Sequence, residues 1–180
     1  MKQPERAFRP LAETQPHLKE FADYLEISAS ESHRGAVLIS TSFLEEQLRK
    51  ILLAFFMADK ASLKLFEGGS PPLGTFSART IACYALGLID QDEYHDLNQL
   101  RLIRNDFAHD MRTSFETRSV VDRCNNLHHK AHDYCHPDQK EVITPPAGQF
   151  KTAASSLMLN LTNRPHYVSQ ERRKPKAWQY

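Results

Sequence analysis

The sequence GAVLISTSFLEEQLRKILLAF, residues 35–55, decides the fold, because its apolar residues recur at the spacing of successive helical turns. That spacing places them on one side of an α-helix and leaves the polar residues on the other side. Ser30 or Ser32 is suited to cap the start of this helix. The helix is strongly apolar from Ile51 onward, so we expect it to be the central helix of the protein. Its predicted core residues are Val37, Thr41, Leu44, Leu48, Ile51, Leu52 and Phe55.

Helical patterns continue on both sides of this segment. Asp90 and Glu93 form an Asp-x-x-Glu capping pair, and Gly87 is placed to cap the helix before them. The predicted helices cover approximately residues 16–29, 76–86, 90–109, 119–134 and 150–161. We find no credible strand and no internal repeat. The sequence therefore predicts an all-α fold, a compact bundle of about six or seven helices.

The composition is that of an ordinary globular protein, with 180 residues, 41% hydrophobic residues and a formal net charge of +1. This small net charge excludes a general polyanion binder. Residues 164–180 are basic, contain proline and have few aliphatic residues, so we expect a disordered tail after one helical domain at residues 1–163. The apolar runs are too short to span a bilayer and the three cysteines form no disulfide framework, which together predict a cytoplasmic protein without a membrane partner.

The sequence RNDFAH begins at Arg104 and ends at His109, at the end of a predicted helix. Metal-independent cleavage of RNA needs a cation for the charge that develops on the phosphate and a group that moves a proton. Arg104 and His109 are suited to these two roles, and Asn105 would orient the phosphate or its partner. Arg101 and Arg112 would extend the anion site. These residues form the candidate catalytic site if the protein is a nuclease.

The same motif has a structural alternative, which we favour because short motifs of this kind often occur by chance. Arg104 would then pair with a carboxylate such as Asp106, Asp110 or Glu45 inside the bundle. His109 would cap carbonyl groups at the end of the helix or meet the negative end of the helix dipole.

Cysteine and histidine residues lie in the predicted helix 119–134 and directly after it. Cys124, His128, His132 and Cys135 would lie on one face, and thiolate and imidazole groups suit zinc. One straight helix cannot place four ligands around a single ion, so we favour a histidine-rich helix face and expect no metal and no cofactor.

The two predicted helices on either side of Gly87 superficially resemble a helix-turn-helix. The second helix begins with carboxylates, at Asp90, Asp92, Glu93 and Asp96, which would repel the phosphates of DNA. We therefore expect two packed antiparallel helices and no direct sequence-specific DNA binding.

The sequence GGSPPLG, residues 68–74, predicts a tight turn between helices, because glycine and proline end helices and build turns. It lacks the Gly-Lys-Ser/Thr ending of a phosphate-binding loop. A fixed loop can also carry contacts, so Gly68, Gly69, Leu73 and Gly74 are weaker candidates for a partner-binding site.

The sequence LFEGGSPPLGTFSAR at residues 65–79, with YALGLI at residues 84–89 and the pair Glu93-Tyr94, resembles the core motif of the mannitol operon repressor family. The glycine-proline loop has one residue more than the family pattern. This resemblance implies an all-helical transcriptional regulator or corepressor that acts through a protein partner and has no helix-turn-helix of its own. A homodimer is a further candidate assembly.

A second, weaker resemblance rests on the Arg-x4-His spacing of Arg104 and His109, which is similar to that of HEPN domains. This resemblance implies the alternative function, a metal-independent endoribonuclease that binds RNA and acts as a dimer. Arg104, Asn105 and His109 would then be its catalytic residues.

Overall fold

A computed structural model describes residues 18–131 and 143–179, and every regular element in these two ranges is a helix. Six of these helices have eight residues or more: α2 Lys19–Ala29, α3 His33–Phe55, α5 Phe76–Ala85, α6 Gln91–His109, α7 Arg118–Asn125 and α8 Pro146–Thr162. The shorter elements are α4 Lys60–Lys64, α9 Arg164–Val168 and the 3-10 helix η2 Ser169–Glu171. The predicted all-α fold class is confirmed.

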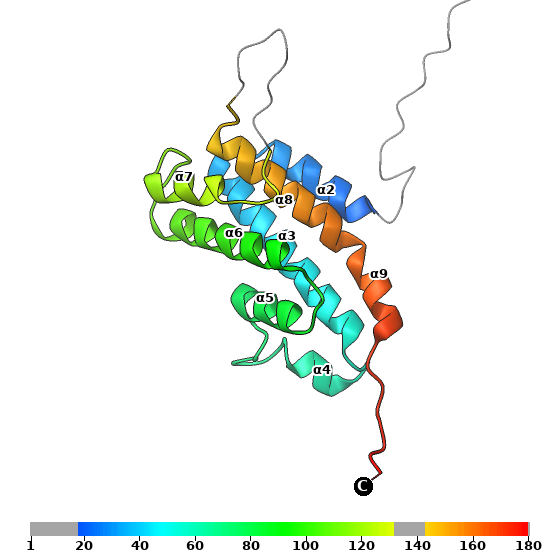
Figure 1. The fold of residues 1–180 in the computed structure, drawn as a ribbon. Helices are drawn as coiled ribbons and strands as arrows, with labels where there is room; N and C mark the ends of the chain where they lie inside the picture. The colour runs from blue at the N-terminus through cyan, green and yellow to red at the C-terminus, as the bar shows by residue number, and fades with distance from the viewer. Residues whose placement is uncertain (1–17, 132–142, 180) are drawn as a thin grey trace, which may run out of the picture.

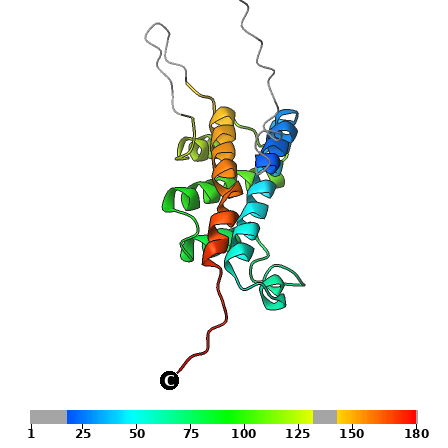
Figure 2. The same ribbon diagram turned by 90° about the vertical axis from the view of Figure 1, so that its right-hand side faces the viewer.

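Helix α3 is the central helix, as its sequence predicted. Figures 1 and 2 show α8 and α9 running along α3, and α5 and α6 also pack against it. The Oγ atom of Ser32 caps α3 by accepting a hydrogen bond from the backbone N–H of Gly35 at 3.1 Å. In the described part of the chain, no helix is both long and apolar enough to cross a membrane.

The turn between α5 and α6 has the predicted caps. Gly87 ends the α5 segment with a φ of +70°, a left-handed conformation that favours glycine. A carboxylate oxygen of Asp90 accepts a hydrogen bond from the backbone N–H of Glu93 at 2.8 Å. Glu93 returns the interaction by accepting from the N–H of Asp90 at 3.0 Å. The capping pair read from the sequence is therefore confirmed as a complete capping box.

Helix α7 is shorter than the sequence predicted. It ends at Asn125, whereas the pattern predicted a helix to residue 134. The backbone N–H groups of His128 and His129 donate to the buried carboxylate of Asp96 on α6, at 2.8 to 3.0 Å. A buried carboxylate needs such donors, and satisfying it draws these backbone groups out of the helical pattern. The last part of the predicted helix lies outside the described residues.

Helical structure continues past residue 163, the domain boundary that the sequence predicted. Side-chain contacts hold α9 and the residues after it against the bundle. The guanidinium of Arg164 donates to the buried carboxylate of Glu93, with Nη2 at 2.8 Å from Oε1. Val168 is buried against the core, and Nε of Arg172 donates to the carbonyl of Ala54 at 3.1 Å. Local composition did not reveal these distant partners.

Replacing Arg164 with methionine is expected to lower the free energy of unfolding by about 3 kcal/mol, because Glu93 would keep a buried charge without its partner. Urea denaturation at pH 7 measures this change. Arg112→Met is the matched control, since the Arg112 side chain is 96% exposed and its loss should change stability by less than about 0.5 kcal/mol. Equal stabilities of the two variants would contradict the conclusion that Arg164 stabilises the buried charge of Glu93.

Candidate functional site

Arg79 on α5 holds the loop between α4 and α5 against α3. Its Nε donates to the carbonyl oxygen of Leu73 at 2.8 Å, and its Nη1 lies 3.5 Å from a carboxylate oxygen of Glu45. The loop closes on itself where the N–H of Gly74 donates to the carbonyl of Pro71 at 3.0 Å. A Cβ atom at Gly74 would lie only 2.6 Å from Cγ of Pro71. The loop is therefore the tight turn that its sequence predicted.

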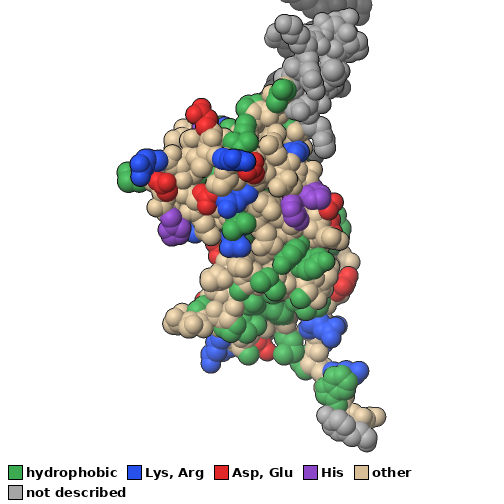
Figure 3. Space-filling model, turned by 60° about the vertical axis from the view of Figure 1, so that its left-hand side comes forward, with side chains coloured by type: hydrophobic (Ala, Val, Ile, Leu, Met, Phe, Trp, Pro, Cys, Tyr) green, Lys and Arg blue, Asp and Glu red, His purple; other side chains and the backbone are tan. Residues whose placement is uncertain are grey.

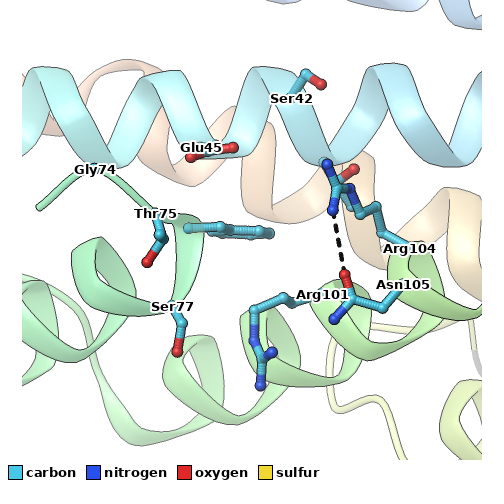
Figure 4. Close-up of a pocket in the computed structure, with 10 residues that line it drawn as sticks. Ser42, Glu45, Gly74, Thr75, Ser77, Arg101, Arg104 and Asn105 are labelled. Carbon is cyan, nitrogen blue, oxygen red and sulfur yellow. Dashed lines mark hydrogen bonds between the residues drawn. The ribbon is translucent and has the colours of Figure 1, made fainter. Parts of the chain in front are cut away.

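A pocket of about 470 Å³ lies where this loop meets α3, α5 and α6 (Figure 4). The side chain of Thr75 caps α5 at this pocket by accepting from the N–H of Ala78 at 3.2 Å. The lining residues are Thr41, Ser42 and Glu45 from α3, Gly74, Thr75, Phe76 and Ser77 from the loop and the start of α5, and Arg101, Arg104 and Asn105 from α6.

The four candidate partner-binding residues of the loop differ in position. Gly68 and Gly69 are exposed, and Gly68 has a φ of +120° that favours glycine. Leu73 is partly buried and packs against the core. Gly74 lines the pocket. The structure thus gives Gly68, Leu73 and Gly74 a structural role, and the role of all four residues in binding a partner stays a prediction.

Helix α6 carries the three candidate catalytic residues but separates His109 from the other two. Arg104 and Asn105 line the pocket, and Nη1 of Arg104 donates to Oδ1 of Asn105 at 3.2 Å. Because α6 continues to His109, five residues of helix turn this side chain about 140° away from Arg104 around the helix axis. His109 is exposed and is not among the lining residues. The geometry therefore does not bring the arginine and the histidine of one chain to a common phosphate, and their catalytic role stays a prediction.

The predicted structural partners of Arg104 are also engaged elsewhere, so this expectation is corrected. Each of the three candidate carboxylates pairs with a different arginine: Asp106 with Arg123, Glu45 with Arg79 and Asp110 with Arg112. Within the described ranges Arg104 has no carboxylate partner. Arg101 is half-buried, and its Nε atom is buried without a hydrogen-bond partner in these ranges.

Histidines surround the carboxylate of Asp96, whose side chain is 0% exposed. In addition to the two backbone N–H groups, Nδ1 of His129 lies 2.9 Å from Oδ2 and Nδ1 of His95 lies 3.1 Å from Oδ1. Burial by itself would raise the pKa of Asp96, because it disfavours the charged form. The hydrogen bonds from the backbone and rings of these residues outweigh burial and hold the pKa of Asp96 below its ordinary value.

The same cluster contains the groups that hold divalent ions in other proteins. Ligand atoms of His95, Asp96 and His128 lie within 4.8 Å of one another. Sequence reasoning missed His95 and Asp96 as members of this cluster, because the predicted helix placed His128 on a continuous face of α7. The hydrogen bonds to Asp96 are sufficient to explain why these three residues lie together, and no bound ion is needed for this.

Two of the four Cys/His residues that the sequence offers as candidate zinc ligands lie in the described part of the chain. Cys124 is buried in the core, and burial raises the pKa of its thiol to about 12, which disfavours the thiolate that zinc requires. His128 lies beyond the end of α7 and is exposed. His132 and Cys135 lie outside the described residues.

Comparison with known proteins identifies relatives of the chain. Residues 23–161 match the Mannitol repressor family. The chain is 27% identical over 136 residues to the mannitol operon repressors of Escherichia coli strains K12 and O6:H1, an alignment that covers 73% of this chain. The alignment spans 64% of the length of these relatives.

A solved structure has the same fold. The X-ray structure of the MtlR–HPr complex from Escherichia coli matches with a TM-score of 0.59, at 23% sequence identity. The match covers 86% of this chain and 99% of that chain. At this level of identity the likeness establishes a common helical architecture.

Replacing Asp96 with asparagine is expected to lower the free energy of unfolding by about 2–4 kcal/mol, because the amide NH₂ would face backbone N–H donors. Folding lowers the pKa of Asp96. Its contribution is therefore complete above the unfolded-state pKa of about 3.9 and is lost as the pH falls through the lower folded-state pKa. Urea denaturation between pH 7 and pH 3 should show the difference between wild type and variant shrinking.

Asp92→Asn is the control for this prediction, since the Asp92 side chain is 61% exposed. It should change stability by less than about 0.5 kcal/mol at pH 7. A stability difference for Asp96→Asn that stayed constant over the whole pH range would show that the carboxylate charge is not the stabilising feature.

Proposed function

This chain belongs to the mannitol repressor family, and we propose that it is a transcriptional regulator that acts through contacts with another protein. A structurally similar protein, MtlR from Escherichia coli, has been solved in complex with HPr. That complex supports a protein-binding role for this fold. The proposal places the chain in the cytoplasm, where bacterial transcription takes place.

The charges at the start of α6 support regulation without direct reading of DNA. In a helix-turn-helix, the start of the second helix approaches the major groove and its phosphates. Here α6 begins after a turn with exposed Asp90 and Asp92. These carboxylates would oppose binding to a phosphate backbone. Glu93, the third acid of this turn, is buried and paired with Arg164.

An apolar patch on α5 is the observation that carries the proposal. Ile81, Tyr84 and Leu86 are 52%, 42% and 41% exposed. Tyr94 from α6 stacks on Tyr84, with ring centroids 4.4 Å apart. Figure 3 shows apolar side chains gathered on the lower part of one face, at the height of α5 in Figure 1. Contiguous apolar surface that contains tyrosine is typical of protein interfaces.

The acids beside this patch indicate the kind of partner. Asp90 and Asp92 follow the patch in the chain and are exposed. An apolar centre with an acidic rim is complementary to a protein surface with an apolar centre and a basic rim. We infer that such a surface of the partner protein covers Ile81 and Tyr84.

Replacing Ile81 with arginine is expected to weaken binding of a protein partner by about tenfold or more, because a charge would be desolvated at the centre of the interface. Calorimetric titration with purified Escherichia coli HPr, the protein bound by the structural relative, measures this effect. Ile27→Arg on α2 is the matched control, since Ile27 is 43% exposed. HPr that binds both variants equally well would exclude the α5 patch as its site.

The protein alone is expected to select no DNA sequence. Repeated selection from a library of random duplexes, at near-physiological salt, should enrich no motif, and binding to any duplex should stay in the non-specific range, weaker than about 10⁻⁶ M. Recovery of one enriched sequence that the protein binds at nanomolar concentration would contradict the proposed mode of regulation.

A further inference from the structure

We propose that the pocket between α3, α5 and α6 binds a phosphate monoester group. This inference does not depend on the proposed regulatory function. It begins with two arginines at one pocket. Several other arginines of this bundle, among them Arg79, Arg123 and Arg164, have carboxylate partners. Arg101 and Arg104 line one pocket, and neither has a carboxylate partner within the described ranges.

Arg101 provides the first argument for an anion. Its Nε atom is buried and has no hydrogen-bond partner among the described residues. A donor on a charged group that is buried without an acceptor is costly, because it has lost its hydrogen bonds to water. Arg101 lines the pocket, so an oxyanion there would supply the negative charge that this guanidinium lacks among the described residues. Ser77 at the start of α5 lines the same pocket, and both side chains are drawn in Figure 4.

Arg104 lies three residues after Arg101 on α6, so both side chains leave the same face of the helix. Figure 4 shows the guanidinium of Arg104 on the α3 side of the pocket, where its hydrogen bond to Asn105 is drawn. The other donors of this guanidinium have no partner in residues 18–131 and 143–179, so they can meet a ligand. Two arginines that border one pocket suit phosphate, because guanidinium groups bind its oxygens in a bidentate manner.

The start of α5 adds donors on the opposite wall of the pocket. Phe76 and Ser77 are the first two residues of this ten-residue helix and line the pocket. Backbone N–H groups of a first helical turn have no partner within the helix and favour negative charge. The Thr75 side chain occupies only the N–H of Ala78. The N–H groups of Phe76 and Ser77 and the Ser77 hydroxyl are therefore candidate additional donors from residues that line the pocket.

Glu45 is the single acid among the lining residues, and its charge is balanced by Arg79 at 3.5 Å. The pocket thus keeps the positive charge of both free arginines. Its volume of about 470 Å³ exceeds that of a phosphate ion and falls in the range of small-molecule sites. The phosphate can therefore belong to a small phosphorylated molecule or to a phosphorylated side chain. His109 does not line the pocket. The proposed site therefore binds the phosphate group without this histidine as a proton-transfer group.

Binding of inorganic phosphate to the full chain, followed by calorimetry or ³¹P NMR, tests the proposal. Chloride at matched ionic strength serves as the reference. Arg101→Gln and Arg104→Gln should each weaken phosphate binding by about tenfold or more, because each removes a charge-assisted contact. Arg112→Gln is the control and should leave binding within about twofold, since Arg112 is an exposed arginine outside the pocket.

Two results would overturn the proposal. One is phosphate binding that is equal in wild type, Arg101→Gln and Arg104→Gln while circular dichroism shows that all three are folded. The other is an equal response of the wild type to acetate and to phosphate, which would indicate a general anion effect. If Arg101→Gln does not fold, Arg104→Lys provides a second test. Lysine keeps the positive charge at exposed position 104 but lacks the planar guanidinium. Phosphate binding should therefore be weaker than in the wild type but still measurable.

The source of the phosphate is distinguished by two further probes. Glycerol 3-phosphate and a short phosphoserine peptide are titrated against the wild type and Arg104→Gln. Tighter binding of the first, lost in the variant, assigns the pocket to a small phosphorylated molecule. Tighter binding of the peptide, lost in the variant, assigns it to a phosphorylated protein. Failure of both to bind more tightly than inorganic phosphate would remove the monoester assignment.

Discussion

Burial of α3 on several sides at once is the constraint on which the other elements depend. Val37, Leu44, Leu48 and Ile51 are each 0% exposed, and burial of such a side chain contributes about 1.5–3 kcal/mol. A helix that is covered in this way needs neighbours on several faces, and α5, α6, α8 and α9 supply them. Its buried hydroxyls are satisfied locally: that of Ser40 donates to the carbonyl of Ala36 at 2.6 Å. The apolar length of α3 thus determines how much of the chain must fold around it.

Buried charges then determine which segments dock on this framework. Glu93 recruits Arg164 from a stretch that is otherwise basic and polar, and α9 extends the bundle as a result. Asp96 draws the backbone of His128 and His129 toward α6 and ends α7 early. Each carboxylate would be costly without its donors. Apolar packing forms the core, while these two acids determine how α9 docks and where α7 ends.

The distribution of arginine partners separates structural residues from residues that are free to bind a ligand. Arg79 is engaged by the carbonyl of Leu73 and by Glu45, so it holds the loop in place. Arg101 and Arg104 lie at a pocket, and among the described residues neither has a carboxylate partner. The apolar patch of Ile81 and Tyr84 is a separate surface on α5, formed by residues other than those that line the pocket. One helix therefore contributes to a proposed anion site at its start and to a proposed protein interface further along.

The sequence by itself determined the helical class, the central position of α3 and the capping box at Asp90 and Glu93, because periodicity and caps depend on neighbours within a few residues. The core motif likewise determined the family, now shown by the match over residues 23–161. The tertiary structure alone decided where α7 ends and how α9 docks. It also decided which carboxylates pair with which arginines, and it left Arg104 at a pocket from which His109 is turned away. The physical reason is that a buried charge is satisfied by whichever donor folding brings within reach, and sequence separation does not encode that distance.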